Sequence, residues 1–332
     1  MSREGMVVID EEETNESYGN APLCRPMEKH LQLSFIPLDK PAGPTSHEVV
    51  AWVRKILGVE KAGHSGTLDP PATGLLPVGL GDATKALTVL LMGPKEYYTV
   101  ARLHDPADDK TLMDTLSLFT GEIYQRPPQR SSVKRVTRTR MIYELELVER
   151  VGNLLLLRVL CQAGTYIRKL VYDMGEILGP GATMVELRRS RVSHLSEDDG
   201  LVKLHELLDA YQSWKESGDE DGLRKLVKPV EDVVSHLKTV TIRDSAVDAI
   251  CHGAQLAVPG VLKVSKGIGK GDPVTVLTLK DELVALAEAT MSTEELAESK
   301  KGLAMLTKRV IMRPGTYPRM WKAGEKGKAG VA

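Results

Sequence analysis

Apolar and polar positions follow one another along this chain in patterns that predict both helices and strands. In 49–57 the apolar residues recur at helical spacing, Ser46 precedes them as the expected N-cap, and Gly58 is the expected helix end. Strands are expected at 35–38, 97–103, 141–150 and 154–161, and further helices at 83–91, 166–178 and 201–211. Because these elements show no regular strand–helix–strand repeat, the pattern favours an α+β fold over a doubly wound parallel sheet.

The pattern changes after Arg191. Residues 193–235 are acidic and helical in pattern, whereas short strand-like runs separated by Gly, Pro and Asp begin near His236. Strands are expected at 239–242, 261–264, 273–279, 283–289 and 306–312, with a helix at 245–252 that starts at Ser245 and ends before Gly253. This spacing predicts a small β-barrel. We expect an N-terminal extension (1–33), a first domain (34–235), a second domain (236–316) and a flexible basic tail (317–332).

Composition restricts the class of protein. A chain of 332 residues is long enough for about two domains. No apolar run is long enough for a transmembrane helix, and the polar N-terminus lacks a signal-peptide pattern. Cys24, Cys161 and Cys251 lie far apart and form no Cys-x-x-Cys pair, so neither a disulfide framework nor a zinc site is expected. We therefore expect an intracellular protein with free thiols and no catalytic metal.

Charge is segregated along the chain, although the net charge is only −1. Basic residues without an intervening acid fill 126–140, and two further basic groups follow in 168–191 and 300–319. Those of the first group are Arg126, Arg130, Lys134, Arg135, Arg138 and Arg140. Acidic residues gather at 10–13, 197–199 and 219–221. Such segregation favours a polyanion-binding face, although a solvated surface of mixed charge remains the alternative for any single cluster.

The stretch 63–79 carries one acid, Asp69, among residues that restrict or free the backbone. The glycines are Gly63, Gly66, Gly74 and Gly79, and the prolines are Pro70, Pro71 and Pro77. A strand or helix of such composition would be weak, whereas a rigid loop that presents one carboxylate to a ligand needs these residues. The alternative is a surface turn with an incidental Asp. It accounts for Asp-Pro alone but not for the whole stretch, which also holds His64 and Thr67.

The motif Gly63-His64-Ser65-Gly66-Thr67-Leu68-Asp69-Pro70 resembles the signature of the TruB-like pseudouridine synthases. Three further stretches match the family in its order. They are Lys40-Pro41-x-Gly43-x-Thr45-Ser46, Lys95-Glu96-Tyr97, and Gly164-Thr165-Tyr166-Ile167-Arg168 followed by Leu187-Arg188-Arg189. The resemblance covers 34–191, and it implies a catalytic domain with a mixed, mainly antiparallel sheet and flanking helices.

Other stretches are similar to the archaeal and eukaryotic H/ACA-guided branch, the dyskerin family. They are Arg102-Leu103-His104, 125–135, 253–260 and 309–318. The resemblance implies a C-terminal PUA RNA-binding β-barrel and an N-terminal extension that docks on it; disorder of this extension is the alternative. It also implies a guide RNA and three protein partners: a small zinc-ribbon protein, a Gar-type barrel protein and a kink-turn binder. The long Lys-rich tail of nucleolar members is absent, so an archaeal-type cytoplasmic enzyme is expected.

The resemblance further implies an isomerisation of uridine to pseudouridine, which requires no cofactor. It assigns Asp69 as the nucleophile, Arg168 as its partner, and Tyr97 as the residue against the flipped base and a candidate for the late proton abstraction. Leu187 would pack on the other face of the uracil. His64 and Lys40 would lie nearer the RNA backbone, while Arg126 and Arg188 would grip phosphates.

Each assignment has a structural alternative. Tyr98 rather than Tyr97 could be the pocket residue, Arg168 a surface arginine, Leu187 a core residue and His64 a structural hydrogen-bonding group. For the protein as a whole, the alternatives to a guided enzyme are a stand-alone enzyme for the tRNA T-loop uridine and a non-catalytic RNA-binding scaffold of the same fold.

Overall fold

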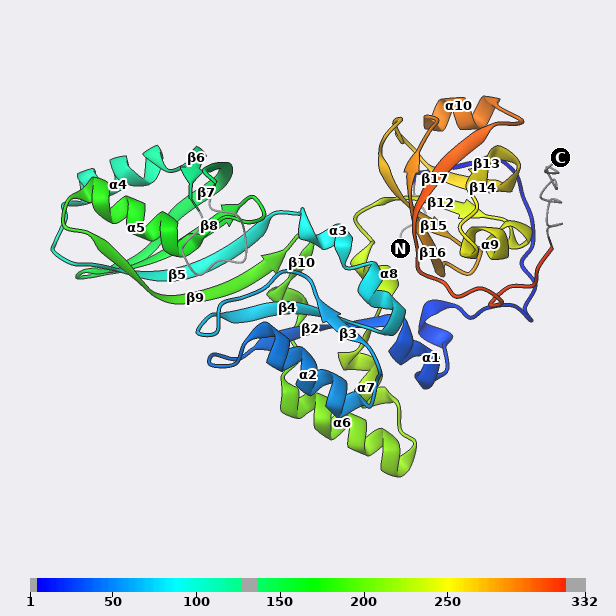
Figure 1. Ribbon diagram of the computed structural model, residues 1–332, viewed down its shortest axis with the longest axis horizontal. Helices are drawn as coiled ribbons and strands as arrows, with labels where there is room; N and C mark the ends of the chain where they lie inside the picture. The colour runs from blue at the N-terminus through cyan, green and yellow to red at the C-terminus, as the bar shows by residue number, and fades with distance from the viewer. Residues whose placement is uncertain (1–4, 127–135, 321–332) are drawn as a thin grey trace, which may run out of the picture. The chain divides into compact units, whose positions relative to one another are not determined.

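The computed structural model describes residues 5–126 and 136–320, which form two units (Figure 1). One unit comprises Ser34–Lys228. The other combines the N-terminal segment through Leu33 with the chain from Pro229 onward. The short strand β11 (Lys228–Pro229) lies at the boundary. The segment 229–235 thus belongs to the C-terminal unit, whereas sequence placed the boundary at 236. Contacts within that unit explain the difference, because Val230 N donates to Leu33 O at 2.9 Å.

The Ser34–Lys228 unit is built on one large sheet. Its described strands follow the spatial order β2 (Ser34–Lys40), β4 (Thr73–Leu80), β9 (Ala182–Val192), β5 (Lys95–Leu103), β8 (Leu154–Cys161), β7 (Arg138–Val151) and β6 (Gly121–Gln125). Two short strands, β3 (Ala62–His64) on β4 and β10 (Leu195–Ser196) on β9, also belong to it. Among these described strands β4 and β9 pair in parallel and the others antiparallel. The prediction of an α+β fold with a mainly antiparallel sheet is confirmed.

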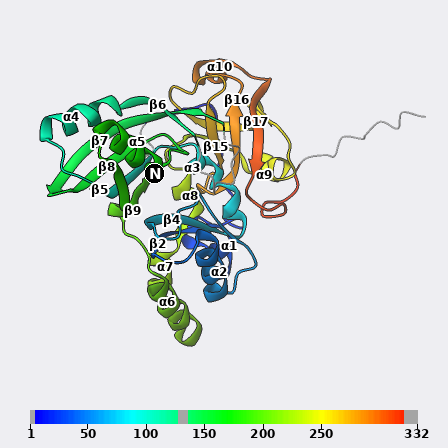
Figure 2. The same cartoon turned by 60° about the vertical axis from the view of Figure 1, so that its left-hand side comes forward.

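Helices lie against both ends of this sheet. They are α2 (Ser46–Leu57), η2 (Gly81–Lys85), α3 (Thr88–Leu91), α4 (Asp109–Leu118), α5 (Ile167–Leu178), η3 (Glu197–Asp199), α6 (Leu204–Ser217) and α7 (Asp221–Leu226). Strands β5 and β9 run from the end that carries α4 and α5 to the end that carries β2–β4, and α2 and α6 lie side by side in Figure 1 and Figure 2. The core under α4 and α5 includes Leu112, Leu157 and Leu170.

Two strands that position the site were not expected from the sequence. Strand β4 contains Gly74, Pro77 and Gly79, yet all but its first residue are buried. Pro77 lies opposite Pro37 of β2, so the two residues without an N–H share one rung of the ladder. Strand β9 was also missed. The expected helix at 83–91 is instead two short pieces, η2 and α3.

Two helix starts differ from expectation. Thr45, not Ser46, caps α2: its hydroxyl accepts from Glu48 N at 3.2 Å, while Glu48 accepts from Thr45 N. The hydroxyl of Ser46 instead contacts the backbone of Leu68. Helix α9 (Asp244–Cys251) starts after Arg243 rather than at Ser245.

The second unit contains a seven-stranded sheet among its described residues. The strand order is β1 (Met6–Val8), β14 (Val261–Ser265), β12 (Lys238–Ile242), β15 (Pro273–Leu277), β16 (Leu283–Ala289), β17 (Leu303–Val310) and β13 (Leu256–Ala257). The remaining elements of the unit are η1 (Pro22–Cys24), α1 (Met27–Gln32), α8 (Val230–Val233), α9, η4 (Val258–Gly260) and α10 (Thr293–Glu298).

The N-terminal extension packs on this unit through named contacts. Its strand β1 pairs with β14, and the backbone N–H groups of Asn15 and Asn20 donate to the buried carboxylates of Asp244 and Glu282 at 3.0 and 2.9 Å. Arg25 and Glu231 form an ion pair at 2.6 Å whose side chains are 3% and 7% exposed. The extension is therefore held by backbone pairing and by buried charge.

Candidate active site

Asp69 lies on the loop between β3 and β4, and backbone hydrogen bonds shape this loop. Ala72 N donates to Asp69 O at 3.0 Å, which closes a turn around two prolines. Ser46 of α2 binds the loop on the other side: its hydroxyl accepts from Leu68 N at 2.9 Å and donates to Leu68 O at 3.2 Å. The carboxylate itself remains exposed. The loop is thus fixed on both sides of Asp69 while the side chain faces solvent.

Lys40 lies beneath the loop. Its side chain is fully buried, and Nζ donates to the carbonyl oxygens of Pro41, Pro70 and Ala72, each at 2.9 Å. Burial lowers the pKa of Lys40, while the nearby charge of Asp69 opposes this effect. An ammonium group has three donors, and all are used inside the fold. This differs from the expected position near the RNA backbone, because no donor is left for a phosphate.

Arg168 reaches Asp69 from a distant part of the chain. It is the second residue of α5, and its Nη2 donates to Asp69 Oδ2 at 2.5 Å. The two side chains are 57% and 52% exposed, so the pair lies at the surface. A guanidinium is charged at every accessible pH, so Arg168 places a permanent positive charge beside the carboxylate. The structure thus joins two residues that are 99 positions apart.

Tyr97 lies on β5 directly opposite Arg189 of β9. Burial raises the pKa of Tyr97, and the charge and hydrogen bond of Arg189 oppose this rise. The negative charge of Asp69 raises the pKa of Tyr97 further. Because successive side chains of a strand alternate between faces, Tyr98 points to the other face of β5. The geometry therefore groups Tyr97, rather than Tyr98, with Asp69.

Arg189 was not singled out by sequence as a site residue. Its side chain is fully buried; Nε donates to Leu75 O at 2.9 Å and Nη2 donates to Gly66 O at 3.1 Å. Arg189 thereby connects the residues before and after the Asp69 loop turn, Gly66 and Leu75, to the strand position opposite Tyr97. A basic residue in the middle of a buried strand was the available signal, but β9 had not been recognised as a strand.

The other expected site residues occupy different settings. His64 packs edge-on against His47 with ring centroids 5.1 Å apart, and burial, followed by the charges of His47 and Arg189, lowers the pKa of His64. Leu187 is half-buried on β9 and packs against the core. Arg188 donates to Asp39 at 3.0 Å and to Glu197 at 2.7 Å, so its charge is already balanced by two carboxylates.

Part of the first basic group can be placed. Arg126 is exposed directly after β6, and Arg138 and Arg140 belong to β7. Arg130, Lys134 and Arg135 lie outside the described residues, as does most of the expected tail at 317–332. In the part of the chain that the structure describes, no three His, Cys, Asp or Glu side chains are grouped to hold a metal ion. No described helix is long and apolar enough to cross a membrane.

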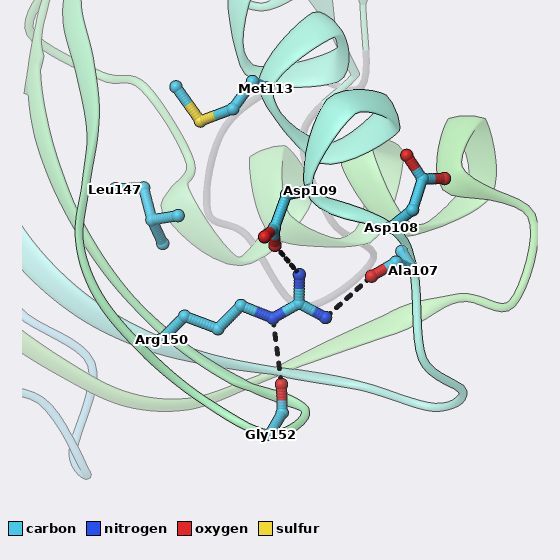
Figure 3. Close-up of a pocket in the computed structure, with 7 residues that line it drawn as sticks. All are labelled: Ala107, Asp108, Asp109, Met113, Leu147, Arg150 and Gly152. Carbon is cyan, nitrogen blue, oxygen red and sulfur yellow. Dashed lines mark hydrogen bonds and ion pairs between the residues drawn. The ribbon is translucent and has the colours of Figure 1, made fainter.

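A separate hollow of about 890 Å³ lies between α4 and the end of β7 (Figure 3). Arg150 spans it and donates to Gly152 O at 3.1 Å, to Asp109 Oδ1 at 2.5 Å and to Ala107 O at 2.7 Å. None of the expected site residues lines this hollow. The hydrogen bonds of Arg150 go to residues that line the hollow, and the hollow shares no residue with the Asp69 site.

Four family models match the chain. The TruB family pseudouridylate synthase N-terminal domain matches residues 54–167, and the tRNA pseudouridylate synthase B C-terminal domain matches 168–235. A PUA domain matches 238–311, and a DKCLD (NUC011) domain matches 2–50.

Relatives and solved structures agree with these models. Proteins of Methanopyrus kandleri and Methanocaldococcus jannaschii, each named probable tRNA pseudouridine synthase B, are both 52% identical to this chain. The alignments cover 95% and 96% of this chain and 93% and 95% of the relatives. A chain in the crystal structure of a Cbf5-Nop10-Gar1 complex superposes with a TM-score of 0.87 at 50% identity, covering 96% of this chain and 97% of that one. A chain in the structure of an H/ACA RNP bound to a substrate RNA containing 2'-deoxyuridine gives a TM-score of 0.87 at 47% identity, covering 95% and 97%.

Proposed function

The chain belongs to the TruB family of pseudouridylate synthases, and we propose that it isomerises selected uridines of RNA as the catalytic subunit of an H/ACA guide ribonucleoprotein. The observation that carries this proposal is the exposed Asp69–Arg168 ion pair, with Tyr97 close enough for its pKa to respond to the charge of Asp69. This isomerisation requires a nucleophilic carboxylate and a general base, for which Asp69 and Tyr97 are the candidates. The likeness to chains of H/ACA complexes at 47% and 50% identity supports the guided form of the reaction.

In the proposed reaction Asp69 acts on a uridine that has been flipped out of its stack. Its carboxylate either attacks C1′ of the ribose, with uracil leaving as an anion, or adds to C6 of the base. The N1–C1′ bond breaks, the uracil rotates, a C5–C1′ bond forms, and the bond to Asp69 breaks, which returns the free carboxylate. C5 then loses its proton and N1 gains one, so the product is an isomer and no redox partner is needed.

The remaining residues have distinct parts in this proposal. Arg168 pairs with Asp69 and orients it. Tyr97 lies against the base and is the candidate for abstraction of the C5 proton, for which its phenol must first ionise. Leu187 covers the other face of the uracil. His64, the last residue of β3 before the loop, contacts the displaced nucleotide. Lys40 supports the loop from below instead of touching RNA, because its three donors are occupied.

Phosphate contacts are assigned to exposed basic residues. Arg126 is exposed and has no acid beside it in sequence, so we keep it as a phosphate-binding residue. Arg188 joins the grip only if RNA replaces Asp39 or Glu197 as its partner. A phosphate contact predicts weaker RNA binding with a smaller salt dependence when Arg126 is replaced by Gln.

We propose the same domain roles as those expected from sequence, with the boundary moved to 229. The first unit carries the chemistry. The C-terminal unit is a PUA domain that binds the guide RNA or a tRNA end, with the N-terminal extension docked on it. The partners proposed are a guide RNA, a small zinc-ribbon protein, a Gar-type barrel protein and a kink-turn binder. We place the enzyme in the cytoplasm, which cell fractionation tests.

Tritium release from RNA labelled at C5 of uridine tests the activity, because every turnover removes the C5 hydrogen. The purified chain is supplied with guide, target and partner proteins, and separately with tRNA alone. We expect turnover with wild type and none with Asp69→Asn, while RNA binding is retained. Asp105→Asn removes another exposed acid that follows β5 and serves as the matched control. Turnover by Asp69→Asn at the wild-type rate would overturn the assigned role.

A second substrate is favoured by the name of the relatives, which refers to tRNA. Turnover on tRNA without guide or partners would establish a stand-alone activity on the T-loop uridine beside the guided one. If wild type is inactive on both substrates while it binds RNA, the chain is a scaffold and the proposed catalysis is wrong.

A further inference from the structure

Arg168 can pair with Asp69 only if the start of α5 is held in place. Ile167 and Leu170 pack in the core there, but Tyr166, the N-cap of α5, makes no side-chain capping hydrogen bond. The segment that leads into it contains Gly164 at φ +79°. The first backbone N–H groups of a helix have no partner within the helix, so their partners must come from other elements.

A buried glutamine from another element supplies the missing contact. Gln125 is the last residue of β6 and is 2% exposed. Its Oε1 accepts from Tyr166 N at 2.9 Å, and its Nε2 donates to Tyr166 O at 3.1 Å. The side-chain amide therefore binds both polar groups of one backbone residue, as a neighbouring β-strand would. Two hydrogen bonds from one planar group restrict both the position and the tilt of this residue.

From this geometry we infer that Gln125 is a positioning residue for the reaction, acting through Tyr166 to hold Arg168 on Asp69. The inference rests on the proposed function, since it assigns a purpose to the Asp69–Arg168 pair. Gln125 touches neither substrate nor the reacting atoms. Its amide fixes the residue two positions before Arg168, while Arg168 itself is more than half exposed and has little packing to hold it.

The location of Gln125 adds a link to RNA. Arg126, the proposed phosphate contact, is its direct neighbour in sequence. Gln125 also pairs with Arg138 in the β6–β7 ladder. The clamp on Tyr166 therefore lies directly beside the proposed phosphate contact in sequence.

Gln125→Glu tests the clamp, because the introduced side chain has the same shape and depends on pH. One carboxylate oxygen can still accept from Tyr166 N, but the other faces Tyr166 O and has no proton to donate. Protonation restores that donor, and burial raises the pKa of the introduced carboxyl group above its ordinary value near 4.3. We expect single-turnover rates about 10²-fold below wild type at pH 8, as for a misplacement of about 1 Å. The ratio to wild type should rise steadily toward pH 5.5.

Two further variants make the test specific. Gln125→Met keeps an unbranched side chain without hydrogen bonds and should show the loss at every pH. Gln162→Glu is the matched control from the same segment: Gln162 Oε1 accepts from Met141 N at 3.1 Å, which a carboxyl group in either protonation state continues to do. Its ratio to wild type should stay constant across the pH range. Thermal unfolding of each variant at each pH shows that the rates refer to folded protein.

The outcomes separate this inference from the proposed function. An inactive wild type in the complete assay contradicts the proposed function itself. If wild type is active, wild-type rates in both Gln125 variants overturn the clamp. A loss in Gln125→Glu that does not recover on acidification also overturns it, because the amide hydrogen bonds would then not be what matters. If Gln125→Met does not fold, the pH dependence of the Gln125→Glu rate still tests whether the amide hydrogen bonds to Tyr166 position Arg168.

Discussion

Gly74 is the place where β4 and β9 approach each other, and its replacement by alanine tests how the site is assembled. The residue has φ +97°, a region that other L-residues rarely adopt. A Cβ atom at this position would lie 2.3 Å from Arg189 O and 2.9 Å from Arg189 N. The pairing of β4 with β9 passes through this contact, and Arg189 in turn holds both limbs of the Asp69 loop.

The cost of Gly74→Ala has two parts. A positive φ in a residue with a Cβ costs about 1–2 kcal/mol. In addition, the strands must separate by about 1 Å to bring the new contact into the ordinary van der Waals range, and forced backbone shifts of this kind cost about 1–3 kcal/mol. We therefore expect the free energy of unfolding of this unit to fall by about 2–5 kcal/mol.

Gly43→Ala is the matched control. Gly43 has φ +110°, and a Cβ atom added there would meet no other atom within 4 Å, so only the backbone cost of about 1–2 kcal/mol applies. Urea unfolding followed by circular dichroism gives both free energies, and the difference between them isolates the close approach. Equal losses in the two variants would refute the reasoning, because they would show that β9 moves aside without cost.

Three other predictions follow from single contacts. Lys40→Met removes three hydrogen bonds beneath the loop, so we expect the turnover rate to fall by about 10²-fold with little change in RNA affinity; an unchanged rate would contradict the support role. Because the pKa of His64 is lowered, the unfolded chain binds more protons than the folded one as pH falls through about 6.5. Stability should therefore decrease on acidification, and His64→Gln should lose less of it between about pH 7 and pH 5 in urea titrations; parallel losses would exclude this origin. Arg25→Met leaves the Glu231 carboxylate buried without its partner and should lower the free energy of unfolding by about 3–5 kcal/mol, with part of the loss restored by adding Glu231→Gln. Absence of that recovery would show that the ion pair is not the cause.

Elements that carry their own signal were predictable. The helix at 49–57 has an apolar stripe, a capping box and a terminal glycine, all within one short stretch, and α2 is found there. Strands β7 and β8 follow runs of branched and apolar residues. In these segments local preference and the final fold agree, so the pattern alone is sufficient.

Strands β4 and β9 show the limit of such reasoning. Glycine and proline lower the intrinsic preference of β4 for a strand, but burial between β2 and β9 overrides it. The same glycine that weakens the strand allows β9 to approach. The structure of 73–80 was therefore decided by its burial between β2 and β9, which the residues of 73–80 alone do not reveal.

The candidate site divides in the same way. Asp69 was singled out by its own surroundings, because a dense set of glycines and prolines around one acid indicates a rigid loop. Lys40 and Arg188 were expected to face RNA, because basic side chains usually lie at the surface. In the fold, Lys40 instead donates to three carbonyl oxygens and Arg188 pairs with two carboxylates. Gln125 carried no local signal, since its contact is a backbone residue 41 positions away.

The sequence by itself determined the class of fold, many of the longer regular elements, the loop with its single acid and, through its motifs, the family. Only the tertiary structure decided which side chains meet that acid, which basic residues support the loop instead of facing solvent, and what holds Arg168 in place. The physical reason is range: capping, periodicity and backbone restriction act within a few residues, whereas an ion pair or a buried amide contact depends on where the sheet brings distant strands together.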